Sequence, residues 1–262
     1  MKNNKLRISK CFLKAANSLI NLLVILCLLT AGAYAVYALW DNRQIYAAAE
    51  DVQADMLKLK PEAGDAASFE ELLSLNPDVC AWLTLDNTSI DYPVLQGSTN
   101  LDYINHDVYG SFSLAGSIFL DSRNKRDFSD SYSLIYGHHM EKHEMFGDLD
   151  SYKDETFFEK NKTGMLLLPT GAYKLEILAC LVANAGEKLI FEPGQQQDLT
   201  TEFVSYARNN SLHLHEETIQ KLEQMESPKI LALSTCSSEF TDARTVILTV
   251  MEPCQAADQE EK

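Results

Sequence analysis

The chain has 262 residues, with 22 lysines and arginines against 38 aspartates and glutamates, and its formal net charge is −16. The charge is unevenly distributed, because residues 1 to 40 carry five basic side chains and no acidic one, which leaves 17 basic and 38 acidic side chains in residues 41 to 262. A body with a net charge of −21 excludes binding to nucleic acid or to anionic lipid through bulk charge.

The N-terminal region has the composition of a membrane anchor. Residues 1 to 17 are basic, and Ser18 to Trp40 then run for 23 residues without a charge. About 20 apolar residues suffice to cross a bilayer, and a basic flank stays in the cytoplasm. The small residues from Ala31 to Ala35 leave a cleaved signal peptide as the alternative, but the apolar core of such a peptide usually has only about 7 to 15 residues. We therefore expect an uncleaved single-pass anchor with the C-terminal body outside the cell.

The region after the anchor predicts a helical spacer and then a β-rich body. Alanine and charged residues dominate Asp41 to Leu75, which predicts a helix that is broken at Pro61 to Gly64 and restarts with Ser68 as its N-cap. From Val79 onward, short β-branched or aromatic runs alternate with Gly, Asn, Asp and Pro, as in an all-β barrel. Apolar residues at helical spacing in Asp198 to Met225 predict a helical insertion.

These changes in composition predict the domain organisation. One globular domain of about 180 residues is large enough to bury a proper core. The cysteines lie at positions 11, 27, 80, 180, 236 and 254, without paired spacing, so we expect no disulfide framework. The expected segments are a cytoplasmic basic segment (1–17), a transmembrane anchor (18–40), a helical spacer (41–75), a β-barrel domain (76–254) and an acidic tail (255–262).

The stretch from Lys229 to Val250 carries a candidate nucleophile. An apolar run ends at Cys236, a short polar turn follows, and Arg244 opens a second β-branched run, which predicts two adjacent strands. A permanent cation near a thiol favours the thiolate and can later hold an oxyanion. The alternative is a structural cysteine, since cysteine is among the most frequently buried residues.

A second polar cluster favours the catalytic interpretation. The expected strand from Tyr132 to Tyr136 ends in Gly137-His138-His139-Met140. A histidine just past a strand end can exchange protons with a group on a neighbouring strand. Cysteine, histidine and arginine at strand ends therefore predict an acyl-transfer site. The alternative, a metal site in HHMEKH, lacks a carboxylate or second cysteine at ligand spacing, so we expect neither metal nor cofactor.

These motifs resemble those of the class B sortases. The resemblance includes the Gly137 to Met140 segment, the Leu233 to Cys236 segment and an arginine eight residues after the cysteine. It extends over Phe69 to Glu252. Further segments similar to the early strands and turns of the family are Asn76 to Leu83, Ile90 to Gln96 and Gly116 to Asn124.

The resemblance implies a fold and a reaction. The expected fold is mainly β, a closed sortase-type barrel with N-terminal helices and a helix-containing insertion before the cysteine strand. Cys236 is expected to attack the carbonyl after the threonine of a C-terminal sorting motif and form a thioester. His138 is expected to act as acid and base, and Arg244 to steady the substrate or the oxyanion. An amine from a cell-wall precursor or a pilin lysine then resolves the thioester.

The resemblance also implies a substrate groove. Asn100, Ile104 and Ser234 match family positions that line it, with Ile104 in place of the more usual leucine. His139 is expected to pack or to form a hydrogen bond, whereas His213 and the nearby His215 are expected to face solvent.

Two other functions remain open. One is an extracellular cysteine protease that releases the same thioester to water, and the other is a catalytically idle, membrane-anchored binding domain. The intact Cys, His and Arg set argues against the idle domain. The expected partners are exported proteins with sorting motifs, an amine acceptor and the membrane.

Overall fold

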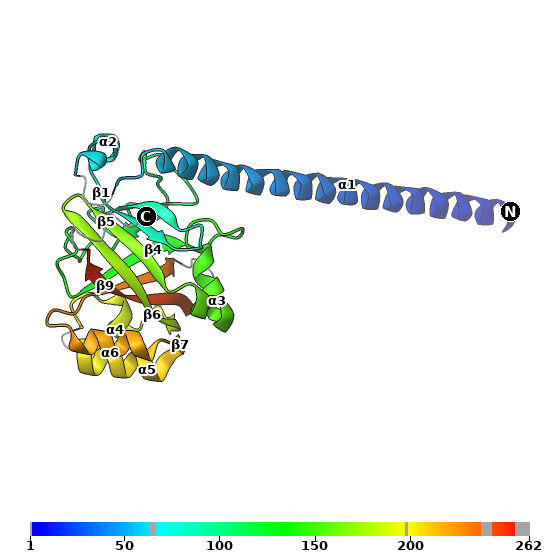
Figure 1. The fold of residues 1–262 in the computed structure, drawn as a ribbon. Coiled ribbons are helices and arrows are strands. Elements are labelled where there is room, and N and C mark those ends of the chain that lie inside the picture. Colours follow the sequence, from blue (N-terminus) through cyan, green and yellow to red (C-terminus); the bar gives the residue numbers. More distant parts are fainter. Residues whose placement is uncertain (1, 63–65, 197–198, 237–242, 255–262) are drawn as a thin grey trace. The chain divides into compact units, whose positions relative to one another are not determined.

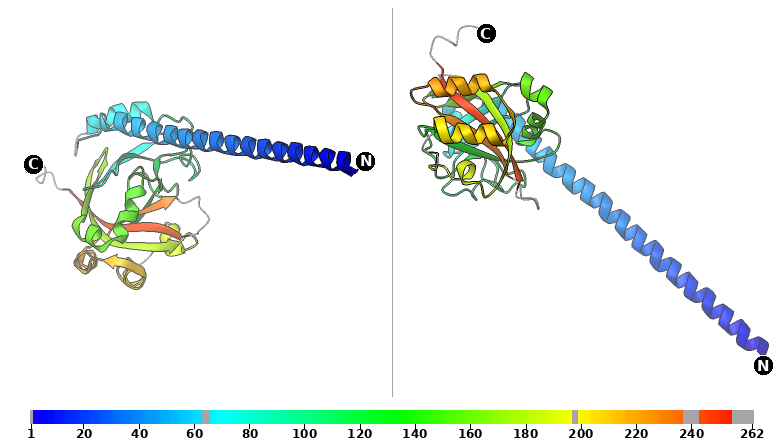
Figure 2. Two further views of the ribbon diagram at one scale, coloured as in Figure 1. Left: turned by 90° about the vertical axis from the view of Figure 1, so that its right-hand side faces the viewer. Right: turned by 90° about the horizontal axis from the view of Figure 1, so that it is seen from below.

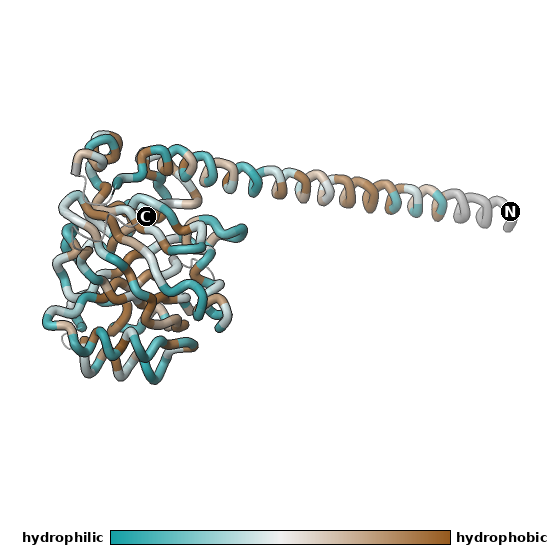
Figure 3. Tube along the Cα trace, in the orientation of Figure 1, coloured by the Kyte–Doolittle hydropathy of each residue, from teal (hydrophilic) through white to brown (hydrophobic). Residues whose placement is uncertain are grey.

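The computed structural model describes residues 2–62, 66–196, 199–236 and 243–254, of which residues 2–11, Ala66 and Cys236 are described by their backbone alone. The chain divides into two units, Met1–Ala47 and Ala48–Lys262. Helix α1 (Lys2–Leu57) begins in the first unit and ends in the second. Its stretch from Phe12 is long and apolar enough to cross a membrane by length and composition, with a mean hydropathy of 2.3 and no buried residues in the most apolar window. Figure 3 shows this apolar stretch as the brown turns of α1.

The segment between the anchor and the barrel is partly helical. The last turns of α1 belong to the second unit, where Ala49 and Met56 are buried. A 3-10 helix, η1 (Ala66–Phe69), then leads into α2 (Glu70–Leu75). The prediction of Ser68 as N-cap was wrong, because residue 68 already lies in the 3-10 turn. Its hydroxyl accepts a hydrogen bond from the backbone of Glu62 at 3.1 Å instead.

The body is a closed β-barrel (Figures 1 and 2), which confirms the predicted fold class. The sheet order is β5-β1-β2-β3-β4-β8-β9-β6-β7, and β5 also pairs with β6, so that the sheet closes and β7 extends it beyond β6. The strands are β1 (Val79–Leu85), β2 (Asp91–Leu95), β3 (Ile118–Leu120), β4 (Tyr132–His138), β5 (Thr163–Leu168), β6 (Gly171–Asn184), β7 (Ser211–Leu214), β8 (Ile230–Cys236) and β9 (Ala243–Pro253).

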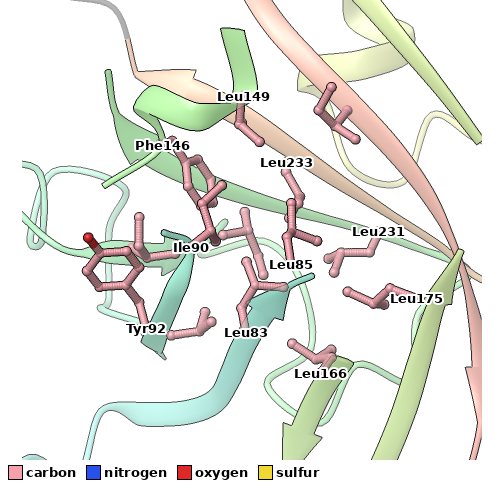
Figure 4. Packing of buried hydrophobic residues seen from close by; sticks show 14 of the residues in the cluster. Leu83, Leu85, Ile90, Tyr92, Phe146, Leu149, Leu166, Leu175, Leu231 and Leu233 are labelled. Atoms are coloured by element: carbon pink, nitrogen blue, oxygen red, sulfur yellow. The ribbon is translucent and has the colours of Figure 1, made fainter. Parts of the chain in front are cut away.

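Two hydrophobic clusters lie on the two faces of the central strands. Leu231 and Leu233 of β8 point into the barrel interior, where they join Leu83 and Leu149 (Figure 4). The intervening Ala232 belongs to the second cluster, outside the barrel. Side chains alternate along a strand, so each face of β8 is buried against a different partner. The 3-10 helix η2 (Gly147–Lys153) and α3 (Glu155–Lys160) connect β4 to β5.

The predicted helical insertion lies between β6 and β8 and covers the second cluster (Figure 1). It is not one helix, because β7 separates its two main helices and pairs with β6. The insertion contains α4 (Lys188–Phe191), a π-helical turn (Leu199–Phe203), α5 (Val204–Asn210) and α6 (Glu216–Gln224).

His215 contradicts the expectation that both histidines of the insertion face solvent. Its side chain is buried, its ring stacks on Phe158 with centroids 4.1 Å apart, and Nδ1 donates to the carbonyl of Ile177 at 2.8 Å. The residue precedes α6, and the packing of that helix brings it against β6. His213 is half-buried, and its Nε2 donates to the carbonyl of Lys153 at 2.8 Å.

Candidate active site

The predicted histidine and cysteine meet at one edge of the barrel. Strands β4 and β8 are parallel neighbours, and their register pairs Tyr132 with Ile230 at one end and His138 with Cys236 at the other. Both residues are the last of their strands. The carboxyl ends of parallel strands lie at the same edge of a sheet, so two motifs far apart in sequence become neighbours.

Arg244 reaches the same edge from the other side of β8. It is the second residue of β9, which runs antiparallel to β8. Its Nη1 donates to the carbonyl of Thr235 at 3.1 Å, directly before the cysteine, and its guanidinium lies over the ring of Phe191 at 5.8 Å. The polar turn predicted between Cys236 and Arg244 lies outside the described residues, except for the positions that flank it.

The ring of His138 is held by a backbone carbonyl. Its Nε2 lies 2.7 Å from the oxygen of Ile104. A carbonyl oxygen can only accept, so Nε2 carries the proton and Nδ1 is the nitrogen left to gain or lose one. Gly116 makes room for this contact, because a Cβ there would lie 2.4 Å from the Ile104 oxygen and 3.0 Å from Cδ2 of His138. Its φ of +61° also favours glycine.

A groove of about 280 Å³ opens beside these strand ends. It contains three predicted residues, Asn100, Ile104 and Arg244. Tyr136 was missed, although it lies two residues before His138 on one strand and alternation places both on one face. The described residues that line the groove are Asn100, Leu101, Ile104, Phe119, Tyr136, Ala185, Phe191 and Arg244.

Comparison with known proteins identifies the family. No family model matches the chain. Sortase B of Listeria monocytogenes (serovar 1/2a, strain ATCC BAA-679 / EGD-e) is 33% identical to it over 183 residues, which are 68% of this chain and 72% of the relative. The chain belongs to the class B sortases. Sortase B of Staphylococcus aureus (strain NCTC 8325 / PS 47) is 27% identical over 235 residues, 89% of this chain and 94% of the relative.

Solved class B sortases share the fold. Spy0129 of Streptococcus pyogenes, a class B sortase involved in pilus biogenesis, is 39% identical and has a TM-score of 0.63, covering 70% of this chain and 97% of its own. Staphylococcus aureus sortase B is 30% identical with a TM-score of 0.68, covering 80% of this chain and 99% of its own. This sortase is therefore a cysteine transpeptidase with the sortase-type barrel.

Ser234 is not among the described residues that line the groove of the sortase, although it pairs with Tyr136, which does line it. The side chain is fully buried, and its hydroxyl donates to the carbonyl of Thr235 at 3.2 Å. The residue pairs with Tyr136 on one side and Val246 on the other.

Asn100 forms part of the groove wall and is itself tightly bound. Its Nδ2 donates to Asp121 at 2.9 Å, and its Oδ1 accepts from the backbone of Ser122 at 2.7 Å. The Asp121 carboxylate is fully buried and also accepts from Arg123 at 2.7 and 2.8 Å and from Tyr136 at 3.2 Å. Burial raises the pKa of Asp121, but the hydrogen bonds from Arg123 and Asn100 outweigh it and hold the pKa below its ordinary value.

Acid should destabilise the sortase through Asp121. A carboxyl whose pKa is lower in the folded state adds stability above its unfolded pKa and loses it as the pH falls through the folded pKa. Urea unfolding should therefore show a smaller loss of stability between about pH 5 and pH 3 in Asp121→Asn than in the wild type. The Asn variant should be less stable at neutral pH, since it no longer pairs with Arg123. Equal pH dependence of the two proteins would contradict the assignment.

The two other cysteines that lie in strands, Cys80 and Cys180, lack the properties of a nucleophile. Cys80 and Cys180 are buried free thiols, and burial raises the pKa of each to about 12. Both therefore stay protonated at neutral pH. In the part of the chain that the structure describes, no three metal-binding side chains gather in one place. His139 and His143 pair with different aspartates, Asp150 and Asp148.

Proposed function

We propose that this sortase cleaves the C-terminal sorting motif of an exported protein after its threonine and transfers the acyl group to an amine. The observation that supports this most directly is the pairing of His138 with Cys236 beside a groove that Arg244 also lines. Among solved relatives, Staphylococcus aureus sortase B has been seen in a substrate complex, and that chain is 27% identical to this one. The proposed substrate-binding residues are Asn100, Ile104 and Ser234.

The reaction requires thiolate and imidazolium together. At pH 7, an unperturbed cysteine is about 3% thiolate and an unperturbed histidine about one quarter imidazolium, so about 1% of molecules hold both if the groups are independent. The Cys236 thiolate attacks the threonine carbonyl and forms a tetrahedral oxyanion, which Arg244 steadies. His138 gives its Nδ1 proton to the leaving amine, and a thioester remains. The acceptor amine then attacks the thioester, and His138 takes the proton back.

The mass of the product tests this proposal. The sortase should be incubated with a panel of sorting-motif peptides, with and without an added amine. A transpeptidase gives the amine adduct, with hydrolysis as the slower side reaction. Hydrolysis alone, at any amine concentration, would identify the protein as a protease. No product from any peptide, together with no labelling by a substrate-like thiol alkylating agent, would support the idle binding domain.

A pilin lysine is the second candidate for the acceptor amine. The observation that favours it is the 39% identity to Spy0129, a class B sortase involved in pilus biogenesis. The alternative acceptor is the amine of a cell-wall precursor. Competition between a lysine-containing pilin peptide and a wall-precursor peptide for one thioester separates the two, because the preferred acceptor dominates the adduct masses.

Arg244 should act through its geometry as well as its charge. Its Nη1 already binds the Thr235 carbonyl, and the rest of the guanidinium fork is left to face the groove. Lysine keeps the charge but has no planar fork, so Arg244→Lys should lose about tenfold to a hundredfold in kcat/KM for the amine adduct. The thiol pKa should be measured in both proteins. A lysine variant as active as the wild type would mean that Arg244 acts on Cys236 only through the electrostatic effect of its positive charge.

We propose that Ser18 to Trp40 is an uncleaved span with residues 1 to 17 in the cytoplasm, and that the spacer from Asp41 to Leu75 holds the catalytic domain (76–254) outside, close to the membrane. Protease added to cells stripped of their wall should then digest the domain and leave a protected N-terminal fragment. A mature chain that begins near Val36, found by N-terminal sequencing, would refute the anchor.

A further inference from the structure

A polar cluster lies behind the proposed catalytic residues. Arg244 lines the groove, and side chains alternate along a strand, so its neighbour Thr245 lies on the other face of β9. Thr245 is buried, and its hydroxyl donates to Oδ1 of Asp150 at 2.5 Å. Asp150 belongs to η2, which therefore contacts β9 from the side away from the groove.

The same carboxylate reaches the end of β4. Nε2 of His139, the residue directly after that strand, lies 3.1 Å from Oδ2 of Asp150. Nζ of Lys153 lies 2.7 Å from Oδ1. Burial raises the pKa of Asp150, but the hydrogen bonds from Lys153 and Thr245 outweigh it and lower the pKa below its ordinary value. The group is therefore an anion at neutral pH, and each of its oxygens binds a different strand end.

The cluster continues to the end of β8. Regular register between β8 and β9 runs from Ile230 and Val250 to Ser234 and Val246. Beyond that pair, the backbone N–H of Thr245 donates to the hydroxyl of Thr235 at 3.3 Å. Thr245 therefore binds Asp150 through its side chain and binds Thr235, the residue before Cys236, through its backbone.

Asp150 is presented by a helix that is itself fixed. Leu149 and Tyr152 of η2 are fully buried in the barrel core. Asp148 accepts a hydrogen bond from the backbone of Ser89 at 2.6 Å. Groups held by packing and hydrogen bonds on both sides have little freedom to move, so Asp150 is a fixed point for the strand ends that it binds.

We propose that Asp150 is a positioning residue for transpeptidation. Its carboxylate binds the neighbours of His138 and Arg244 directly and reaches the neighbour of Cys236 through Thr245, and so fixes the spacing of the three proposed catalytic residues. The inference rests on the proposed function of these residues. A displacement of about 1 Å in a catalytic group can cost about a hundredfold in rate. A residue that only stabilised the barrel would instead affect unfolding and leave the rate of the folded enzyme unchanged.

Substitution of Asp150 separates these roles. Asp150→Ala should lower kcat for amine-adduct formation by about tenfold or more, with KM changed less than about threefold, since the groove itself is not touched. Asp150→Asn keeps an acceptor for Thr245 in the same shape and should retain more activity than the alanine variant. A lower melting temperature with unchanged kcat, or an Asn variant no better than Ala, would overturn the proposal.

Thr245 offers a test that keeps the carboxylate. Thr245→Val replaces the hydroxyl with a methyl group of similar size and should lower kcat, whereas Thr245→Ser keeps the hydroxyl and should keep kcat. Thr249→Val is the matched control, because Thr249 is a buried threonine of the same strand whose hydroxyl donates to Leu231 at 3.0 Å. It should leave kcat unchanged. The double variant of Asp150→Ala and Thr245→Val should have a kcat no lower than that of the slower single variant. Additive losses in the two variants would contradict the idea that Thr245 and Asp150 act through their shared hydrogen bond.

A second readout distinguishes failure of this inference from failure of the proposed function. The alkylation rate of Cys236 by iodoacetamide, measured by peptide mapping on the full chain, needs no sorting motif or amine. Asp150→Ala should change this rate by severalfold, and Thr249→Val should not. If the wild type forms no amine adduct, the proposed function fails. The alkylation comparison still tests whether Asp150 affects Cys236. Equal alkylation rates in wild type and Asp150→Ala, with an active wild type, would overturn the positioning role alone.

Discussion

Replacing Cys236 with alanine should abolish thioester and amine-adduct formation and leave the barrel folded. In the proposed mechanism the Cys236 thiolate is the nucleophile and no other group forms the acyl-enzyme, so activity should fall to the background. Alanine fits wherever a cysteine side chain does, so the melting temperature should stay close to that of the wild type. Mass spectrometry of the intact protein after incubation with substrate measures the acyl-enzyme directly.

Cys80→Ala and Cys180→Ala are the matched controls. Both cysteines are buried in strands, so their replacement leaves small cavities and should lower stability, while the adduct still forms at an undiminished rate. Covalent trapping of substrate by Cys236→Ala would refute the nucleophile. So would an equal loss of activity in the two controls.

The strand ends that carry His138, Cys236 and Arg244 were predictable from the sequence, and the structure places all three residues at or next to the end of a strand. The run before His138 and the run before Cys236 are both apolar and short, which marks them as buried strands. Their parallel pairing then brings both carboxyl ends to one edge. The pairing itself could not be predicted from local pattern, because it joins two segments that lie far apart in the sequence.

The parts that the sequence did not predict depend on tertiary contacts. His215 is polar and lies in an amphipathic insertion, so a surface position was the natural expectation until α6 packed it against Phe158. Phe191 reaches the groove from a short helix without periodicity of its own. Asp150 lies in a 3-10 helix rich in charged residues and gives no sign of the buried threonine that it binds.

The double histidine gives the last prediction. His138→Ala should reduce turnover by about a hundredfold to ten-thousandfold, the usual range for the loss of a general acid and base. His139→Ala should cost far less, because that ring binds Asp150, while in the proposed mechanism His138 transfers the proton. The measurement is kcat/KM for the amine adduct in both variants, over the pH range in which the wild type is active.

The two variants also separate chemistry from positioning. Loss of His138 removes the group that protonates the leaving amine, so its residual activity should no longer show the limb of the pH profile that belongs to an imidazole. Loss of His139 removes one of the contacts of Asp150 but leaves the His138 imidazole in place. The pH profile of His139→Ala should therefore keep the wild-type shape at a lower level. If His139→Ala proves the more damaging, the histidine that faces the cysteine is the one after the strand end, and the pairing of His138 with Cys236 does not describe the working enzyme.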